Sequence, residues 1–239
     1  MDPLFEELYA GLVHAGPGSR IDTLRALDLT GLNDPLRVLD IGCGPGASAL
    51  TLLEALPEAE FTAADLHAPF LAEAAHRAAA AGHGGRVHAL AADMRALPFA
   101  PGRFDLLWSE GAAYLMGVPE ALRAWHPLLA AGGRIAFSEP VWLTADPHPR
   151  ARAVFAGYPA MTDIGGVRDR IAATGLRLVA DFLVSDQAWA NYYDPLAARA
   201  AELAAIHGAA HPVLAESAEE IAVRRDHGSD YGYAFFIVA

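Results

Sequence analysis

Several features that mark specialised classes of protein are missing from this sequence. It has one cysteine, Cys43, so no disulfide can form within the chain, and the small secreted folds held by several disulfides are excluded. No stretch of about 18 apolar residues is free of charge, so the sequence predicts no membrane-spanning helix. Its first residues are acidic, whereas a secretory signal begins with basic ones, so we expect no signal peptide and a cytoplasmic location.

Runs of lysine and arginine are missing as well. The chain has 17 Lys and Arg against 29 Asp and Glu, and its formal net charge at pH 7 is -12. Proteins that bind a phosphate backbone usually present a basic face, so we expect neither a nucleic-acid nor a membrane partner. The sequence leaves the oligomeric state open and is compatible with a homodimer.

The chain has 239 residues and an ordinary globular composition. In its first part, sequence patterns typical of strands alternate with patterns typical of helices. Two short helices are expected before residue 30, the second with Ser19 as its N-cap. Short apolar runs then predict strands over 37–41, 60–65, 87–91, 104–109 and 133–138. Helices are expected over 47–55, 68–81 and 118–129, with Gly132-Gly133 as a turn. This alternation favours a parallel sheet covered on both faces.

The rhythm changes after Glu139. A Pro/His-rich loop leads to an expected helix over 164–173, and a strand follows over 176–184. The sequence then predicts helices and no strand over residues 189–225, and a final strand over 233–238. We predict one α/β domain over residues 1–239, with a Rossmann-like, doubly wound, seven-stranded sheet that is mostly parallel and has an antiparallel last strand. Within it we expect an N-terminal helical cap over 1–30, a core over 31–140 and a helical lid inserted over 185–228.

A glycine-rich turn follows the first predicted strand. It reads Gly42-Cys43-Gly44-Pro45-Gly46, and Asp40 precedes it. Glycines let the backbone approach a ligand closely, and the following helix offers free N–H groups at its N-terminus. The spacing G-x-G-x-G differs from the dinucleotide pattern G-x-G-x-x-G, and no P-loop is present. The carboxylate of Asp40 would repel a pyrophosphate, whereas it would attract a ligand with a sulfonium and an amino group.

Two further acids end the next two predicted strands. Asp65 closes the second strand, where a carboxylate can accept hydrogen bonds from both hydroxyls of a ribose. Asp93-Met94 follows the third strand, where the acid can accept from an adenine amino group and the methionine can pack on the ring. The carboxyl ends of parallel strands share one crevice, so these groups together predict an adenosyl-ligand site.

These motifs resemble those of class I S-adenosylmethionine-dependent methyltransferases. The resemblance covers roughly residues 37–140 and rests on the glycine turn, Asp65, Ala92-Asp93-Met94 and residues 128–138. A narrower likeness to a bacterial subgroup of small-molecule methyltransferases of the type 11/25 kind extends over nearly the whole chain. It rests on residues 14–19, 108–114, 138–142 and 230–233. Cys43 and Pro45 are mild departures from the usual turn.

The resemblance implies S-adenosyl-L-methionine as cofactor, S-adenosyl-L-homocysteine as product and a small-molecule methyl acceptor. It places Asp40, Gly42 and Gly44 around the methionine part, and Asp65 and Leu66 on the ribose. The remaining cofactor-binding residues that it implies are Gly18, Ser19, Asp93, Met94, Ser109, Glu110 and Gly111.

A general base is needed only for acceptors that must lose a proton. Candidates near the strand ends are Glu110, Tyr114 and Glu139, with His14 less central. We expect no metal site, because Gly208 interrupts the helix between His207 and His211. The segment after the fourth strand lacks the Asp/Asn-Pro-Pro-aromatic run of adenine-N6 methyltransferases.

Two other functions stay open from sequence alone. One is a nicotinamide- or flavin-dependent oxidoreductase, which the G-x-G-x-G spacing with Asp40 disfavours. The other is a protein that binds S-adenosylmethionine without transferring its methyl group. The aromatic residues of the lid region, such as Trp189 and Tyr192, fit an acceptor-pocket wall and plain packing equally well.

Overall fold

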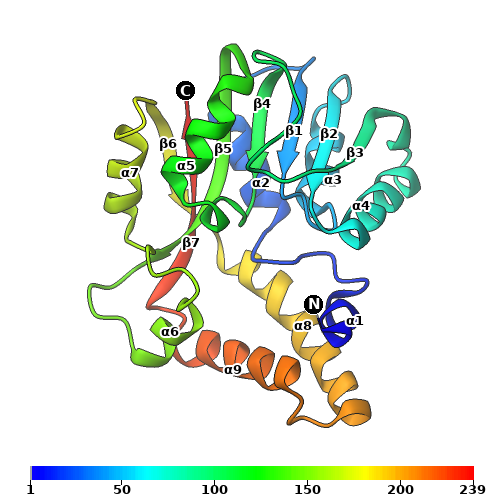
Figure 1. Cartoon of the computed structure of the whole chain (residues 1–239), viewed down its shortest axis with the longest axis vertical. Helices are drawn as coiled ribbons and strands as arrows, with labels where there is room; N and C mark the ends of the chain where they lie inside the picture. The colour runs from blue at the N-terminus through cyan, green and yellow to red at the C-terminus, as the bar shows by residue number, and fades with distance from the viewer. Residues whose placement is uncertain (1) are drawn as a thin grey trace.

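The β-branched, apolar run Arg37–Ile41 forms strand β1 near the centre of a seven-stranded sheet. A computed structural model describes residues 2–239 of the chain (Figure 1). The strands follow one another in space in the order β3-β2-β1-β4-β5-β7-β6. The other six are β2 (Glu60–Asp65), β3 (Val87–Ala91), β4 (Phe104–Ser109), β5 (Leu129–Trp142), β6 (Leu178–Leu183) and β7 (Tyr231–Val238).

Strands β1 to β5 are paired in parallel, and β7 runs antiparallel to both β5 and β6. The chain starts at β1, adds β2 and β3 on one side, and then crosses back to place β4 and β5 on the other side. The strand order therefore reverses between β1 and β4. In open sheets of this kind, ligands bind at such a point, outside the carboxyl ends of the strands. The predicted doubly wound sheet with an antiparallel last strand is confirmed.

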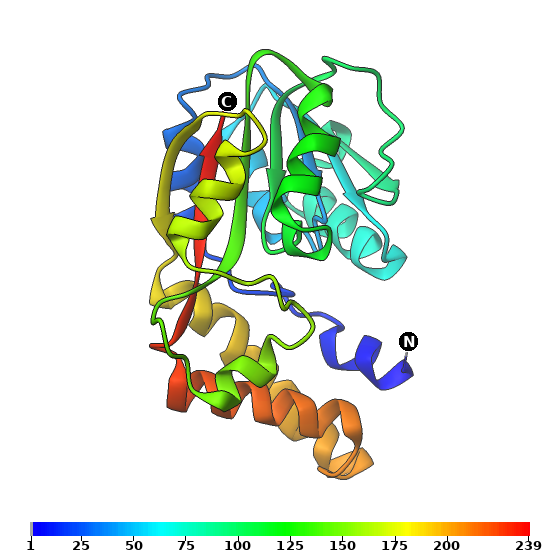
Figure 2. The same cartoon turned by 60° about the vertical axis from the view of Figure 1, so that its left-hand side comes forward.

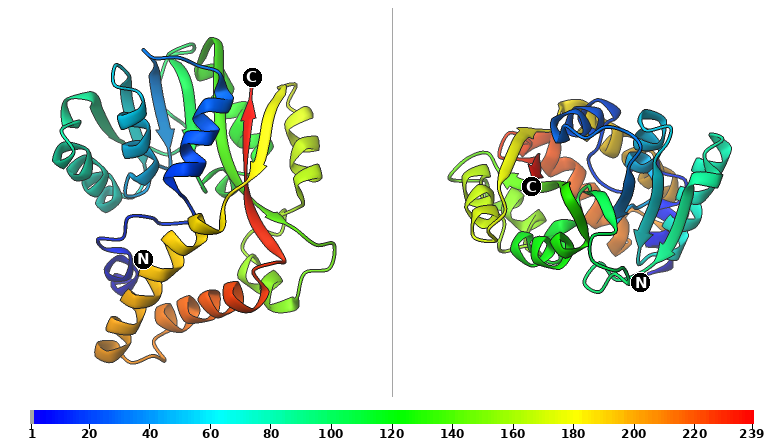
Figure 3. Two further views of the ribbon diagram at one scale, coloured as in Figure 1. Left: turned by 180° about the vertical axis from the view of Figure 1, so that it is seen from behind. Right: turned by 90° about the horizontal axis from the view of Figure 1, so that it is seen from above.

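Helices cover both faces of the sheet. On one face lie α2 (Arg20–Thr30), α3 (Ala47–Ala55) and α4 (Ala68–Ala80), seen in front of the sheet in the left view of Figure 3. On the other lie α5 (Val118–Trp125) and α7 (Ile164–Ala172), which come forward in Figure 2. Each face has its own buried cluster, around Trp108 on the first and Trp125 on the second.

Four helices lie beyond the carboxyl ends of β1 and β4, in the lower part of Figure 1. They are α1 (Pro3–Tyr9), α6 (Pro149–Val154), α8 (Asp186–His207) and α9 (Pro212–His227). The helices α8 and α9 join β6 to β7, which confirms the predicted helical insertion before the last strand. No helix among residues 2–239 is long and apolar enough to cross a membrane. Short 3-10 turns lie at η1 (Gly84–Arg86), η2 (Ala113–Leu115) and η3 (His126–Leu128).

Strand β5 is longer than the predicted strand over 133–138. It begins at Leu129, so the helix expected over 118–129 ends early, and Gly132-Gly133 lies inside an irregular stretch of β5 rather than in a turn. At its other end β5 continues through Pro140 to Trp142, because β7 pairs with it that far. The pairing of β4 with β5 stops at Phe137, so Pro140 faces a strand on one side only, where its missing N–H is tolerated. Helix α6, in a segment predicted as a loop, was missed.

Strand β7 is buried along its whole length, so we expect core substitutions there to lower the stability of the fold strongly. Phe236 is 0% exposed and stacks on Phe137 of β5, with ring centroids 5.5 Å apart. We expect Phe236→Ala to lower the free energy of unfolding by about 3–5 kcal/mol, since a buried ring is lost and a cavity remains. Urea unfolding followed by circular dichroism measures this change. The control Ile206→Ala, at a position on α8 that is 72% exposed, should stay within about 0.5 kcal/mol of the parent. Equal losses in the two variants would contradict the assigned core.

Candidate functional site

The glycine turn between β1 and α3 forms the floor of the site. Gly42, Gly44 and Gly46 have φ angles of 71°, 52° and 90°, which side chains rarely tolerate. A Cβ on Gly42 would lie 2.6 Å from the Cβ of Ala112, so the close approach of the two loops also requires glycine. A Cβ on Gly44 would meet nothing closer than Ala15, at 3.8 Å, which leaves the backbone there open toward the cavity. The turn therefore offers bare backbone at the N-terminus of α3.

Asp65, the last residue of β2, holds this turn in place. One carboxylate oxygen accepts a hydrogen bond from the backbone N–H of Gly44 at 2.9 Å, and the other from that of His67 at 2.8 Å. The side chain is half-buried and lines the cavity. A carboxylate has more acceptor positions than these two bonds use, so Asp65 can also accept from a pair of hydroxyls on a ligand.

Asp40 lies beneath the turn and outside the cavity lining. Its Oδ2 accepts a hydrogen bond from the hydroxyl of Ser48 at 3.1 Å, and its Oδ1 has no partner among residues 2–239. Burial, reinforced by the nearby charges of Glu110 and Asp65, raises the pKa of Asp40 well above its usual range. A fully buried oxygen without a partner is costly, so this group would be stabilised by a ligand that brings a donor or a positive charge.

Glu110 follows β4 and faces the glycine turn from across the cavity. Its Oε1 accepts hydrogen bonds from the Thr23 hydroxyl at 2.8 Å and from the Trp108 indole N–H at 2.9 Å. Its Oε2 lies next to Gly18, where an added Cβ would be 3.2 Å away. Burial raises the pKa of Glu110 to about 7, although these two hydrogen bonds oppose the rise. The carboxyl group therefore titrates near neutral pH.

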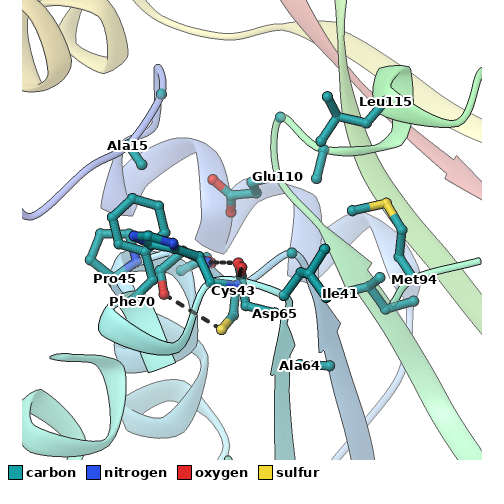
Figure 4. A pocket seen from close by; sticks show the side chains of 18 of the residues that line it. Ala15, Ile41, Cys43, Pro45, Ala64, Asp65, Phe70, Met94, Glu110 and Leu115 are labelled. Atoms are coloured by element: carbon teal, nitrogen blue, oxygen red, sulfur yellow. Dashed lines mark hydrogen bonds between the residues drawn. The ribbon is translucent and has the colours of Figure 1, made fainter. Parts of the chain in front are cut away.

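The turn after β3 supplies the third side of the cavity. The Asp93 carboxylate accepts a hydrogen bond from the backbone N–H of Arg95 at 2.9 Å. The backbone carbonyl of Met94 accepts one from the indole N–H of Trp125 at 3.0 Å, which ties the turn to α5. Figure 4 shows the side chains of Asp65, Met94 and Glu110 around one space, with Phe70 on the side opposite Met94.

These groups line one cavity of about 570 Å³, within the range usual for small-molecule sites. Ten of the predicted residues are in its lining: Gly18, Gly42, Gly44, Asp65, Leu66, Asp93, Met94, Glu110, Gly111 and Tyr114.

Four predicted residues lie outside the lining. Ser19 caps α2 instead, with its hydroxyl accepting from the Asp22 N–H at 3.1 Å. The hydroxyl of Ser109 donates to the carbonyl of Ile41 at 2.9 Å, which joins the ends of β4 and β1. Asp40 lies under the turn, as described. Glu139 is fully buried behind the wall of the cavity, where it accepts a hydrogen bond from Tyr158.

The lining also includes His14, which the sequence offered as a less central base candidate, and two residues that no motif indicated. The segment before α2 contributes His14, and α1 and α4 contribute Phe5 and Phe70. This segment is held by α8, since Gly18 N–H donates to the carbonyl of Ala188 at 3.2 Å and Asn191 donates to the carbonyl of Gly18 at 3.0 Å. Burial, and to a smaller extent Arg77, lowers the pKa of His14. An isolated aromatic residue in a helix carries no spacing signal, which is why the sequence did not reveal Phe5 and Phe70.

Other reactive residues give no sign of a second kind of chemistry. The Cys43 thiol is buried in the glycine turn, and burial together with the charges of Asp40 and Asp65 raises its pKa. A thiol in this environment stays protonated and is a poor nucleophile. Among residues 2–239, no group of three or more His, Cys, Asp or Glu is placed to hold a metal ion.

Comparisons with known proteins agree with this geometry. Residues 38–133 match the family described as methyltransferase domain. Over 105 residues the chain is 41% identical to the malonyl-[acyl-carrier protein] O-methyltransferase of Pseudescherichia vulneris, covering 44% of this chain and 39% of that protein. Over 111 residues it is 40% identical to the trans-aconitate 2-methyltransferase of Streptomyces avermitilis, covering 45% and 40%. The match thus spans about two fifths of the length of these curated relatives.

A solved structure resembles the chain over its whole length. It is a SAM-dependent methyltransferase from Geobacter sulfurreducens in complex with S-adenosyl-L-homocysteine, with a TM-score of 0.83 and 18% sequence identity. The alignment covers 100% of this chain and 98% of that one, so the likeness includes the helices beyond the strand ends. The fold inferred from the sequence is confirmed. Residues 38–133 match a methyltransferase domain, and the chain has the fold of this SAM-dependent methyltransferase.

Proposed function

We propose that this protein is an S-adenosylmethionine-dependent methyltransferase that acts on a small-molecule acceptor. The observation that carries the proposal is the convergence of the glycine turn, Asp65, Asp93-Met94 and Glu110 on one cavity. The names of the relatives, both methyltransferases, support it, as does the S-adenosyl-L-homocysteine complex of the structural neighbour.

The residues present fit this cofactor at each of its three parts. The Asp65 carboxylate has acceptor positions left for the ribose hydroxyls, and the Asp93 carboxylate and Met94 thioether suit the adenine. The methionine end would lie over the bare backbone at Gly44. There the unpartnered Oδ1 of Asp40 lies below and Glu110 stands opposite, so two buried carboxyl groups favour a positively charged amino group.

When bound, this cofactor supplies a methyl group already activated by its positively charged sulfur. The chain then has to align acceptor and methyl group and exclude water, which can be worth roughly 7–11 kcal/mol in favourable cases. Gly111 and Tyr114, which line the cavity after β4, are proposed to hold the acceptor side. Glu110, Tyr114 and Glu139 remain the proposed proton acceptors for substrates that need one.

Further parts of the proposal concern the surroundings of the site. The segments over 1–30 and 185–228 are proposed to act as cap and lid. In support, α1 and the segment before α2 contribute to the cavity lining, and that segment also contacts α8. The net charge of -12 supports the absence of a nucleic-acid partner, and the single cysteine is in keeping with a cytoplasmic location.

Cofactor binding is the first test. We expect S-adenosylmethionine and S-adenosylhomocysteine to bind with dissociation constants on the order of micromolar in a calorimeter. Asp65→Ala should weaken both by about 10- to 100-fold, because hydrogen bonds to a charged group are lost. The control Asp146→Ala changes an aspartate whose side chain is 100% exposed and should leave binding unchanged. If neither ligand binds the parent protein, or if NAD(H) binds instead, the proposed function fails.

The raised pKa of the half-buried Glu110 carboxyl leads us to expect that cofactor affinity depends on pH. In the empty site its pKa is about 7. A positively charged amino group beside it would favour the carboxylate, so binding releases a proton and tightens as pH rises. Between about pH 7.5 and pH 6 we expect affinity to fall by up to about tenfold.

Calorimetry across this pH range with the parent protein and Glu110→Gln measures the effect. The variant keeps an acceptor for the Thr23 hydroxyl and the Trp108 N–H but cannot titrate. Its affinity should therefore be nearly constant across the range. Asp22, Asp40 and His14 also lie near this carboxyl group, and a full pH dependence in Glu110→Gln would move the assignment to one of them.

A further inference from the structure

All seven tyrosines of the chain lie in one cluster beyond the carboxyl ends of the strands. The members come from five separate segments: α1, η2, the loop before α7, α8 and β7. They pack with Trp189, whose ring stacks on one of them. The tyrosine cluster, as we call it, consists of Tyr9, Tyr114, Tyr158, Tyr192, Tyr193, Tyr231 and Tyr233.

The tyrosine cluster forms the wall of the cavity on the side of β4. Tyr114 belongs both to the cluster and to the cavity lining, and its ring centroid lies 5.6 Å from that of Tyr158. A Cβ on Gly111, another lining residue, would be 3.7 Å from a ring carbon of Tyr233. A molecule placed beside Glu110 and Gly111 therefore meets tyrosine rings next.

Two carboxyl groups lie behind this wall, Glu139 fully buried and Glu220 half-buried. Glu139 is 0% exposed, and its Oε1 accepts a hydrogen bond from the Tyr158 hydroxyl at 2.6 Å. Its Oε2 has no partner among residues 2–239. Burial raises the pKa of Glu139 to about 8, partly opposed by Tyr158 and Arg170, so it is largely neutral in the empty site. On α9, Glu220 accepts from the Tyr193 hydroxyl at 2.8 Å, and burial raises its pKa too.

The arginine side chains near the cavity already bind other groups of the protein. The sequence contains no lysine, and Arg95 is the arginine in the cavity lining. The Arg95 guanidinium donates to the carbonyl of Leu115 at 2.9 Å and lies 3.5 Å from the Asp93 carboxylate. Arg170 donates to the Tyr158 hydroxyl and to the carbonyl of Ala160. Among residues 2–239, a negatively charged acceptor would thus find carboxyl groups behind the wall and no unengaged cation in the lining.

The cluster already holds one cation over an aromatic face. The guanidinium carbon of Arg224 lies 3.8 Å from the ring centroid of Trp189, and Arg224 donates to the carbonyls of Gly228 and Tyr231. Attraction between a cation and an aromatic face strengthens when water is excluded. The wall therefore has the electrostatic character of a cation-binding surface.

We propose that the methyl acceptor is an amine, received in the cavity beside the ring of Tyr114, with the buried carboxyl group of Glu139 behind that ring. This inference rests on the proposed function and names the substrate class for the same site. The ammonium form of an amine is attracted by tyrosine faces and favours the ionised form of a nearby carboxyl group, whereas an acceptor that carries a carboxylate is repelled by both. The inference departs from the acid-based names of the two relatives described above.

Methyl transfer to an amine balances without any further reactant. The ammonium first gives a proton to water or to the Glu110 carboxylate in the cavity lining, which frees the nitrogen lone pair. That lone pair forms the new N–C bond to the methyl group, while the C–S bond breaks and its electron pair remains on sulfur. The product is a methylated ammonium, which the tyrosine faces also favour.

Matched pairs of acceptors test the substrate class. Phenethylamine and 3-phenylpropanoate have similar skeletons and differ in charge, as do hexylamine and hexanoate, and 4-ethylphenol provides a neutral hydroxyl. Release of S-adenosylhomocysteine measures turnover, and calorimetry with the protein saturated in S-adenosylhomocysteine measures acceptor binding. We expect the amines to bind and react, and the carboxylates to do neither above background.

Two variants test the assigned residues. Glu139→Gln keeps an acceptor for the Tyr158 hydroxyl and so should fold, and we expect amine affinity and kcat/KM to fall about tenfold, because the variant cannot ionise behind a bound ammonium. The affinity for S-adenosylhomocysteine should not change. The control Glu202→Gln makes the same chemical change on α8, at a side chain that is 67% exposed, and should leave both affinities and turnover unaltered.

The outcomes separate the two proposals. If the cofactor binds but the carboxylates or the phenol react at least as well as the amines, the amine assignment is wrong. It is also wrong if the amines neither bind nor react, or if Glu139→Gln is indistinguishable from Glu202→Gln. If S-adenosylmethionine and S-adenosylhomocysteine fail to bind at all, the proposed function itself is overturned.

Discussion

The hydrogen bond from the Gly44 N–H to the Asp65 carboxylate joins the two halves of the cofactor side of the site. Gly44 lies in a turn of three glycines with positive φ angles, which would otherwise have wide conformational freedom. Asp65 is fixed at the end of β2, and its second oxygen accepts from the His67 N–H at the start of α4. One carboxylate thus sets the turn after β1, the start of the next helix and the spacing between them. The geometry of the cavity floor follows from this contact.

Buried carboxyl groups give the cavity its second physical character. Asp40, Glu110 and Glu139 each have a raised pKa because burial disfavours the charged form. Two of them also keep an oxygen without a partner among residues 2–239. Such groups lower the stability of an empty site, and positively charged ligands relieve that cost. Both proposed ligands, a sulfonium amino acid and an amine, share this charge.

Local motifs predicted which residues of the glycine turn and the strand ends meet in one cavity, because each of these features is encoded within a few residues. Gly42, Asp65 and Asp93 needed only their positions at the ends of successive strands. Ser109 and Glu139 lie outside the cavity lining because they bind partners 68 and 19 residues away, which spacing alone does not reveal. The same holds for β5, whose length is set by pairing with β7 rather than by its own Pro140. The tyrosine cluster draws on five segments, and no single stretch of sequence reveals it.

The helices α8 and α9 are continuous at both ends with sheet strands, β6 before them and β7 after them. Because β7 pairs with both β5 and β6, neither end of this helical pair can move far without disturbing the sheet. We therefore expect α8 and α9 to form a rigid cover over the site and not to open and close as a hinged segment. If the chain methylates small molecules as proposed, we expect it to discriminate among acceptors by the preformed shape and charge beneath these helices, and less by a cover that remodels itself around each one.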